Sequence, residues 1–182
     1  MSRYISLVVF VLCVASTYAI KVVDIDTICK DENVNTSLCI TLLKSKQGAD
    51  LLTLAQYTID VLYTEVNNTV KLIKTLIHQF DKDPTAKSHY RECFELFAKP
   101  NGAAADVEAL ENKMKGGDYD GMREMALFIT ADYESCINDD SPGAIPYPDK
   151  SLLPKYAKVV NDIALILFVI SKILMGNVQF AI

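Results

Sequence analysis

Apolar residues recur at steps of three and four along one long stretch of the chain. The stretch begins after Asp50 and runs for about eight turns without a Gly or Pro. Its apolar positions are Leu51, Leu54, Ala55, Ile59, Leu62, Val66, Val70, Ile73, Leu76, Ile77 and Phe80. This spacing predicts a single amphipathic helix with one buried face, capped by Asp50 and ended at Asp83-Pro84.

Two further helices are predicted by the same period. The second starts at Asp83-Pro84, with the aspartate as N-cap and the proline in the first turn, and its apolar face continues past a break or kink at Pro100-Asn101-Gly102. Gly116-Gly117 closes this stretch. Asp118 then caps a third helix that reaches Cys136.

The last predicted helix follows a loop between Ser141 and Pro148 that contains three prolines and a glycine. It begins near Ser151 or Leu152 and runs to about Met175. Gly176 is its natural stop, because glycine readily adopts the left-handed conformation that ends many helices.

A short helical hairpin is predicted before the long helix. Asp26 to Lys30 and Leu38 to Lys44 form its two helices, joined by a polar turn from Asp31 to Asn35. No segment alternates with period two for long enough to indicate a sheet. The predicted fold is therefore all-α: an up-down-up-down four-helix bundle over residues 50–176, preceded by a helical hairpin over residues 20–48.

The first residues have the pattern of a secretory signal peptide. Arg3 precedes the uncharged apolar run from Ile5 to Val14, and small residues follow, with Thr17 and Ala19 as the pair before the cut. The run is shorter than the ~20 apolar residues that span a bilayer. We therefore predict cleavage after residue 19 and secretion, to the extracellular space and cell wall or, as the alternative, to the vacuole.

A second apolar stretch, from Ile163 to Ile170, lies near the C-terminus. It is bounded by Asp162 and Lys172 and is too short to span a membrane, and Lys172 also interrupts the tail that a lipid-anchor signal requires. A buried helix is the prediction, so no membrane association is expected once the signal is removed.

The cysteine count becomes even in the secreted chain. Cys13 leaves with the signal, and Cys29, Cys39, Cys93 and Cys136 remain. Four cysteines in an oxidising compartment predict two disulfides, with three connectivities open. Pairing 29 with 39 and 93 with 136 is the connectivity that requires no long-range closure from the small hairpin.

Composition and charge exclude several classes of protein. The 182 residues are 51% hydrophobic and 23% charged, which argues against disorder. Arg3 leaves with the signal, so the 18 Lys and Arg fall to 17 against 23 Asp and Glu, and the net charge moves from −5 to −6. That balance excludes a nucleic-acid partner. Asn35-Thr36-Ser37 and Asn67-Asn68-Thr69 are N-glycosylation sequons.

The residues for ordinary catalysis are missing from the sequence. His78 and His89 are the two histidines, and the chain has neither a Gly-x-Ser-x-Gly motif nor a free cysteine after the signal. It also lacks the Cys-x-x-Cys and His-x-x-x-His spacings of metal sites. Carboxylate pairs such as Asp118 with Asp120 are read as helix caps. We predict no catalytic residue, no metal and no cofactor.

The helical stripes leave one binding function open. A bundle can carry a small apolar ligand between its helices, and a stripe of apolar residues does not distinguish such a cavity from a packed core. An extracellular module that binds a small apolar ligand is therefore the alternative to recognition by the outer helix faces.

Several segments, in their order and spacing, resemble the plant invertase and pectin methylesterase inhibitor family. They are the signal peptide, the Cys29-x9-Cys39 hairpin, Tyr90-Arg91-Glu92-Cys93-Phe94-Glu95-Leu96-Phe97, Gly117-Asp118-Tyr119 and Thr130-Ala131-Asp132-Tyr133-Glu134-Ser135-Cys136. The resemblance covers the chain from about Ile25 to Met175 and identifies residues 20–182 as one inhibitor domain.

The resemblance implies a fold and a function. The family is a four-helix bundle with an N-terminal hairpin, and its disulfides join the first cysteine to the second and the third to the fourth. Its members are secreted plant proteins that inactivate pectin methylesterase or acid invertase in a tight one-to-one complex covering the active-site cleft. The bundle helices make most of the contacts in the methylesterase inhibitors.

The same resemblance favours pectin methylesterase over acid invertase. Some invertase inhibitors carry Pro-Lys-Phe at the start of the third bundle helix, where this chain has Asp118-Tyr119-Asp120; Pro154-Lys155-Tyr156 begins the last helix and is not equivalent. Thr130 aligns with a threonine common before the fourth cysteine of methylesterase inhibitors. Thr130 and Tyr119 are thus candidate partner contacts, with a packed threonine and a hydrophobic staple as their structural alternatives.

Overall fold

The computed structural model describes residues 23–98, 100–138 and 147–179. This part of the chain is helical and contains no β-strand. The helices are α2 (Ile25–Cys29), α3 (Thr36–Leu43), a 3-10 turn (Lys44–Lys46), α4 (Leu51–Gln79), α5 (Pro84–Ala98), α6 (Ala103–Lys115), α7 (Tyr119–Asn138) and α8 (Leu153–Gln179). The predicted all-α fold with two disulfides is confirmed. The signal peptide predicted at residues 1–19 lies outside the described residues.

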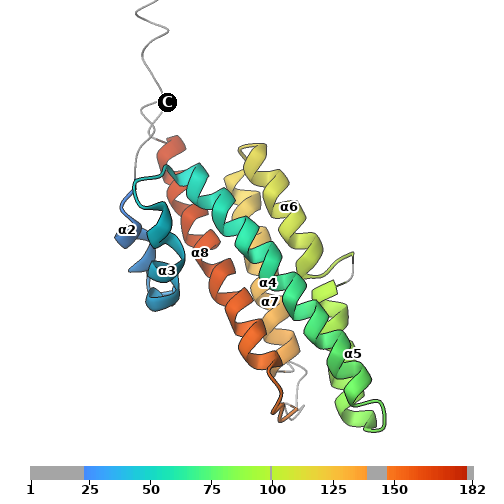
Figure 1. Cartoon of the computed structure of the whole chain (residues 1–182). Helices are drawn as coiled ribbons and strands as arrows, with labels where there is room; N and C mark the ends of the chain where they lie inside the picture. The colour runs from blue at the N-terminus through green and yellow to red at the C-terminus, as the bar shows by residue number, and fades with distance from the viewer. Residues whose placement is uncertain (1–22, 99, 139–146, 180–182) are drawn as a thin grey trace, which may run out of the picture.

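The long helices form the predicted up-down-up-down bundle (Figure 1). α4 packs against α5, α6 and α8, and α7 packs against the same three helices from the other side. α5 and α6 follow one another along one side and together take the place of the second bundle helix (Figure 1). The hairpin of α2 and α3 lies against α8, far from α5 (Figure 1).

The bundle helices begin at the predicted caps. Asp50, Asp83 and Asp118 each accept a hydrogen bond from the backbone N–H three residues further on, at 2.9 to 3.1 Å. These bonds satisfy amide groups that have no partner in the first helical turn, and each cap is worth about 1 kcal/mol. The caps place α4, α5 and α7 in the registers that the sequence predicts.

The second bundle helix is broken at the predicted position, between α5 and α6. Gly102 stands at the N-cap of α6 in an extended conformation. A Cβ atom at this position would overlap the backbone carbonyl of Leu96, so only glycine allows the chain to pass so close to the end of α5. The break lets α6 change direction while both helices keep an apolar face on the core.

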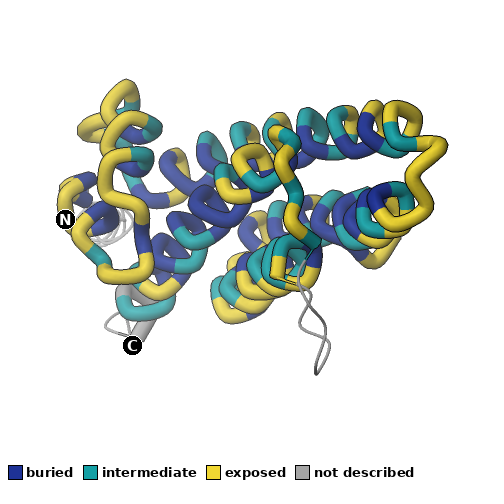
Figure 2. The backbone as a smooth tube through the Cα atoms, turned by 90° about the horizontal axis from the view of Figure 1, so that it is seen from below, coloured by how far each residue is buried: buried dark blue, intermediate teal, exposed yellow. Residues whose placement is uncertain are grey.

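The core follows the predicted apolar stripes (Figure 2). On α4, most of the stripe is buried, and Val70, Ile77 and Phe80 are half-buried against it. Thr58 and Thr69 are also fully buried on α4, where their hydroxyls donate to the carbonyls of Leu54 and Glu65. Their polar groups are thus satisfied inside an apolar interior.

α8 is the central helix of the molecule. It is covered by the bundle on one side and by the hairpin on the other. The segment Leu153–Gly176 is long and apolar enough to cross a membrane, but 61% of its most apolar window is buried inside the protein, as in the core helix of a soluble domain. The predicted stop at Gly176 is wrong: the helix continues to Gln179, because Gly176 lacks the positive φ that ends a helix.

The hairpin is held by one disulfide and by polar contacts to α8. Cys29 and Cys39 are bonded, with a Cα–Cα distance of 5.4 Å. The side-chain amide of Asn35 donates to Asp162 of α8 at 3.0 Å, and Asp162 also pairs with Lys158 at 2.8 Å. Asp162 is only 6% exposed, so both contacts are needed to compensate for its buried charge.

Candidate functional site

Two exposed apolar side chains that are neighbours in sequence distinguish α7 from the other bundle helices in the described part of the chain. Leu127 is 41% exposed and Phe128 is 47% exposed, although both are large and apolar. Among the described residues, no other two neighbours in sequence are both large, apolar and this exposed. Adjacent exposed apolar groups on the outer face of a helix are candidates for a protein-binding surface.

Leu127 and Phe128 lie on either side of the outer edge of α7. Successive residues of an α-helix are rotated by about 100°. Phe128 therefore lies on nearly the same side of the helix as Asp132, four residues later. The charge of Asp106 on α6 raises the pKa of Asp132. Leu127 lies nearer to the side of Thr130, three residues later, which is the opposite flank of the helix. Together they form an apolar ridge, which we call the α7 ridge, on the outside of the bundle.

The position of α7 is fixed at both of its ends. Near the C-terminal end, Cys136 is bonded to Cys93 of α5, with a Cα–Cα distance of 4.8 Å. At the N-terminal end, Gly117 has a φ of 73°, and Asp118 receives a 2.7 Å salt bridge from Lys113 of α6. That contact, with the cap bond, lowers the pKa of Asp118. The α7 ridge is therefore held on a preorganised helix.

The two contact residues predicted from the sequence share one flank of α7. Tyr119 and Thr130 are eleven positions apart, which is about three turns, so they are aligned and separated by about 16 Å along the axis. Tyr119 is half-buried and packs against the core. Thr130 is half-buried, and its hydroxyl donates to the carbonyl of Ala126 at 3.2 Å. Both side chains thus keep an exposed part on the same flank of α7.

Two carboxyl groups meet on the opposite flank, between α6 and α7. Burial raises the pKa of Asp106 to about 6. Burial, and to a smaller extent the negative charge of Asp106, raise the pKa of Asp132 to about 7. A hydrogen bond from the backbone N–H of Ala103 acts in the opposite direction and lowers this pKa. One oxygen of Asp132 is buried without a hydrogen-bond partner in the part of the chain that the structure describes. The pair is therefore partly protonated near neutral pH.

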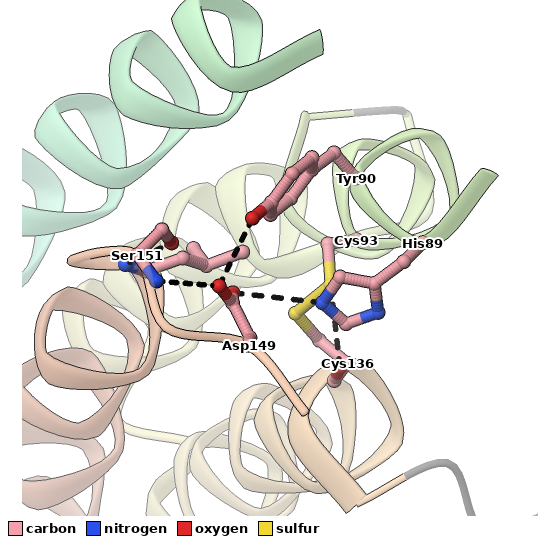
Figure 3. Close-up of polar contacts among 7 residues, drawn as sticks. His89, Tyr90, Cys93, Cys136, Asp149 and Ser151 are labelled. Carbon is pink, nitrogen blue, oxygen red and sulfur yellow. Dashed lines mark hydrogen bonds and ion pairs between the residues drawn. A yellow bond between two sulfur atoms is a disulfide. The ribbon is translucent and has the colours of Figure 1, made fainter. Parts of the chain in front are cut away.

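A polar cluster lies at the end of the bundle where α5, α7 and the start of α8 meet (Figure 3). Asp149 accepts hydrogen bonds from the hydroxyl of Tyr90 at 2.9 Å and from the backbone N–H of Ser151 at 2.7 Å. The Nε2 atom of His89 lies 3.7 Å from the second oxygen of Asp149. Burial raises the pKa of Tyr90, so its hydroxyl remains a proton donor.

Among the described residues, the cluster has a histidine and a carboxylate but no nucleophile placed for catalysis. The hydroxyl of Ser151 accepts a hydrogen bond from the backbone N–H of Leu153 and caps α8. Within the described residues, no group of three His, Cys, Asp or Glu side chains could hold a metal ion. The arrangement anchors the segment before α8.

The two glycosylation sequons differ in their surroundings. Asn35 is exposed and caps α3 through its side-chain oxygen, while its amide nitrogen donates to Asp162. Asn67 is half-buried on α4 and donates to the carbonyl of Tyr63, and the sequon residue Thr69 is fully buried. A glycan on Asn67 would have to be added before α4 packs into the bundle.

Three hollows on the described part of the chain are candidates for a small apolar ligand, and none of the three is enclosed. One, of ≈ 460 Å³, lies between α4 and the segment before α8, and another, of ≈ 370 Å³, lies beside His89. A third, of ≈ 220 Å³, separates α4 from α6 at Tyr63. All three are partly open to solvent, whereas the side chains that face the bundle axis are packed together.

The sequence analysis did not identify the α7 ridge or the cluster around Asp149. A signal for the ridge existed, because Leu127 and Phe128 lie off the period that Met122, Ala126 and Ile129 follow. Large apolar residues outside the core stripe are candidates for a binding surface. No comparable signal existed for Asp149, which follows a loop and meets α5 only in the folded chain.

Comparison with known proteins gives matches along most of the chain. It is 27% identical over 177 residues to "Pectinesterase inhibitor 1" of Arabidopsis thaliana, covering 97% of this chain and 96% of the relative. It is 28% identical over 147 residues to "Pectinesterase inhibitor" of Actinidia deliciosa, covering 79% and 75%.

Solved structures give the same result for the fold. A mutant form of a pectin methylesterase inhibitor from Arabidopsis has a TM-score of 0.67 and 26% identity, covering 81% of this chain and 95% of that one. A further structure of a pectin methylesterase inhibitor from Arabidopsis thaliana has a TM-score of 0.58, also at 26% identity. No family model matches the sequence.

Proposed function

We propose that this chain, which belongs to the plant invertase and pectin methylesterase inhibitor family, inhibits a pectin methylesterase by covering its active-site cleft. The observation that carries the proposal is the match of 97% of the chain to a relative named as a pectinesterase inhibitor. The fold supports it as well, since the similar solved structures are pectin methylesterase inhibitors. The chain acts by binding and performs no catalysis of its own.

The α7 ridge is the proposed centre of the contact. Leu127 and Phe128 supply apolar surface that is removed from water on binding. Tyr119 and Thr130 extend the same surface along α7. The disulfide to α5 and the salt bridge to α6 hold the helix in place before the enzyme arrives. A preorganised face loses little conformational entropy on binding, which favours a tight one-to-one complex.

The acidic surface contributes to the rate of encounter. With a net charge of −6 after signal removal, the inhibitor is attracted to an enzyme with a basic surface. Such attraction weakens as salt shortens the Debye length, whereas the apolar contact at the ridge does not. The association rate should therefore fall with ionic strength while the dissociation rate changes little.

Secretion and modification are part of the proposal. Cleavage after residue 19 leaves residues 20–182 as one inhibitor domain, with the hairpin in 20–48 and the bundle in 50–176. The mature protein is delivered to the cell wall, where pectin is modified, with the vacuole as the alternative. Asn35 is the better placed of the two sequons for a glycan, because it is exposed.

Titration of the purified protein into separate pectin methylesterase and acid invertase assays tests the proposal. We expect methylesterase activity to fall in proportion to added inhibitor and to vanish near equimolar amounts, with invertase unaffected. Inhibition of invertase alone would assign the chain to the other branch of the family. No inhibition of either enzyme across plant isoforms would contradict the proposal.

The role of the ridge is tested by Phe128→Ala, with Tyr63→Ala as the matched control. Both side chains are aromatic and about half exposed, but Tyr63 lies on α4. Loss of a central aromatic anchor costs about 2 kcal/mol, so Phe128→Ala should raise the inhibition constant about 30-fold. The control should change it less than threefold. Equal effects of the two variants would show that the ridge is not the contact.

A further inference from the structure

The largest of the three hollows lies between the C-terminal half of α4 and the segment before α8. Its volume is ≈ 460 Å³, which is within the range of sites that bind small molecules. α4 contributes Leu72, Leu76 and Phe80 to its lining, and the segment before α8 contributes Tyr147 and Leu152. We call this hollow the α4 groove. None of the described residues that line it belongs to α7, so it is separate from the α7 ridge.

Three of the residues that line the α4 groove are aromatic, and their rings are in contact. The ring centroids of Phe80 and Tyr90 are 5.4 Å apart, and those of Tyr90 and Tyr147 are 6.1 Å apart in a T-shaped arrangement. Tyr90 is 1% exposed and its hydroxyl donates to Asp149 at 2.9 Å (Figure 3), so the central ring is fixed. Phe80 and Tyr147 are half-buried and keep part of their ring surface open. Such a group favours contact with a further aromatic ring.

The rim of the groove carries a large apolar side chain that water surrounds. Leu152 is 59% exposed, the highest value of any large apolar side chain in the described part of the chain. The next residue, Leu153, is fully buried and packs the start of α8 into the core, so the core does not account for Leu152. Exposed apolar surface beside an apolar hollow is typical of a ligand-binding groove, because a ligand that covers it removes that surface from water.

The charge that lines the α4 groove differs from that of the protein as a whole. Among the described residues that line it, Lys150 is the only charged one. By contrast, the hollow between α4 and α6 is lined by three carboxylates, those of Asp60, Glu108 and Glu111. Lys150 is exposed and forms no ion pair or side-chain hydrogen bond with the described residues. On a protein that carries more acidic than basic residues, the α4 groove is therefore a place that attracts an anion.

The nearby carboxylate of Asp149 does not reverse this preference. Asp149 lines the hollow beside His89 and not the α4 groove. One of its oxygens accepts hydrogen bonds from the hydroxyl of Tyr90 and the backbone N–H of Ser151. Its side chain is only 5% exposed, so a ligand in the groove contacts Lys150 and not this carboxylate.

We propose that the α4 groove binds a small aromatic carboxylic acid. The ring of the acid lies against Phe80 and Tyr147, and its carboxylate pairs with the ammonium group of Lys150. A neutral aromatic compound lacks the second contact, and an anion without a ring lacks the first. The groove therefore prefers the aromatic acid to both.

A titration with cinnamate, followed by nitrogen–proton NMR spectra of the isotope-labelled protein, tests the proposal. Cinnamate has one phenyl ring and one carboxylate, and cinnamamide is a neutral compound of nearly the same shape. At about pH 6.5 the carboxylate is ionised and lysine is protonated. We expect saturable shifts of the amides of Leu72, Tyr147 and Leu152, with a dissociation constant of about 1 mM for a ligand of this size. Cinnamamide should bind about fivefold more weakly, as expected for the loss of one exposed ion pair.

Three variants separate the charge from the apolar contact. Lys150→Gln should weaken cinnamate binding about fivefold and leave cinnamamide binding unchanged. Lys155→Gln is the matched control, because Lys155 is exposed in the first turn of α8 but does not line the groove, and it should bind as wild type. Leu152→Ala should weaken the acid and the amide alike, by about threefold, since it removes an apolar contact from both.

Three results would overturn the proposal. Shifts that do not saturate, or that lie away from the groove, would show that cinnamate has no site there. Equal affinities of cinnamate and cinnamamide would show that the groove has no preference for an acid. Equal effects of Lys150→Gln and Lys155→Gln would remove Lys150 from the site. The experiment contains no enzyme, so its result is independent of the proposed inhibition of a methylesterase.

Discussion

The carboxyl pair between α6 and α7 should make the bundle less stable as the pH rises. In the unfolded chain both groups titrate near 3.8, but in the fold the pKa of Asp106 is raised to about 6 and that of Asp132 to about 7. The folded state therefore binds more protons than the unfolded state between about pH 4 and pH 7. The stability that protonation provides is present below pH 4 and is lost as the pH rises to 7.

The size of the effect follows from the shift at Asp132. A change from 3.8 to about 7 is about three pKa units, or about 4 kcal/mol at 1.36 kcal/mol per unit. That is an upper limit, because Asp132 and Asp106 are only half-buried and part of the shift belongs to the pair as a whole. We therefore expect Asp132→Asn to stabilise the fold by about 1–2 kcal/mol at pH 7.5. At pH 4.5 the gain should be smaller, because the penalty only begins to build up above the unfolded pKa of 3.8.

Urea unfolding followed by circular dichroism, with both disulfides intact, measures this difference at pH 4.5, 5.5, 6.5 and 7.5. Thermal unfolding provides a second readout, since 1 kcal/mol moves the midpoint of a domain of this size by about 2–4 °C. Asp120→Asn is the matched control: Asp120 is exposed on α7 and pairs with Arg123, so its removal should give no gain. An equal change by Asp132→Asn at all four pH values would refute the reasoning, as would a wild-type stability that does not fall above pH 5.5.

Two further substitutions test the backbone and the hairpin. Gly102→Ala should destabilise the fold by about 2 kcal/mol or more in urea unfolding, because its Cβ would overlap the carbonyl of Leu96, whereas Gly176→Ala in the open part of α8 should be neutral or slightly stabilising. Asn35→Ala should cost about 1–2 kcal/mol, since it removes the cap of α3 and one of the two partners of Asp162. Faster amide exchange in the hairpin than in the bundle would show that the Asn35 effect is local; no loss in either variant would contradict these contacts.

Much of the fold was predictable because its signals are local. The stripe after Asp50 and the caps at Asp83 and Asp118 act within one or two helical turns, so the sequence contains all the information that they need. The break before α6 was also predictable from Gly102. The error at Gly176 has the same origin: glycine permits a stop through a positive φ but does not require one, and α8 continues to Gln179.

The candidate site was harder to predict because its contacts join distant parts of the chain. Asp106 lies on α6 and Asp132 lies on α7. Neither has a sequence pattern that identifies the other as a neighbour. Asp149 meets Tyr90 and His89 across 59 or more residues. The disulfides are the exception, since cysteine has few alternatives in a secreted protein and the helical order left one simple pairing.

The carboxyl pair and the second disulfide both act on α7. Asp132 and Cys136 are about one turn apart on α7; the first interacts with Asp106 of α6, and the second is bonded to Cys93 of α5. Acid removes a repulsion at the first position and leaves the covalent bond at the second unchanged, so the carboxyl pair holds α7 more firmly at weakly acidic pH. Leu127 and Phe128 cannot titrate. A change in pH should therefore alter how firmly α7 is held in the bundle, whereas the apolar side chains of the α7 ridge stay the same.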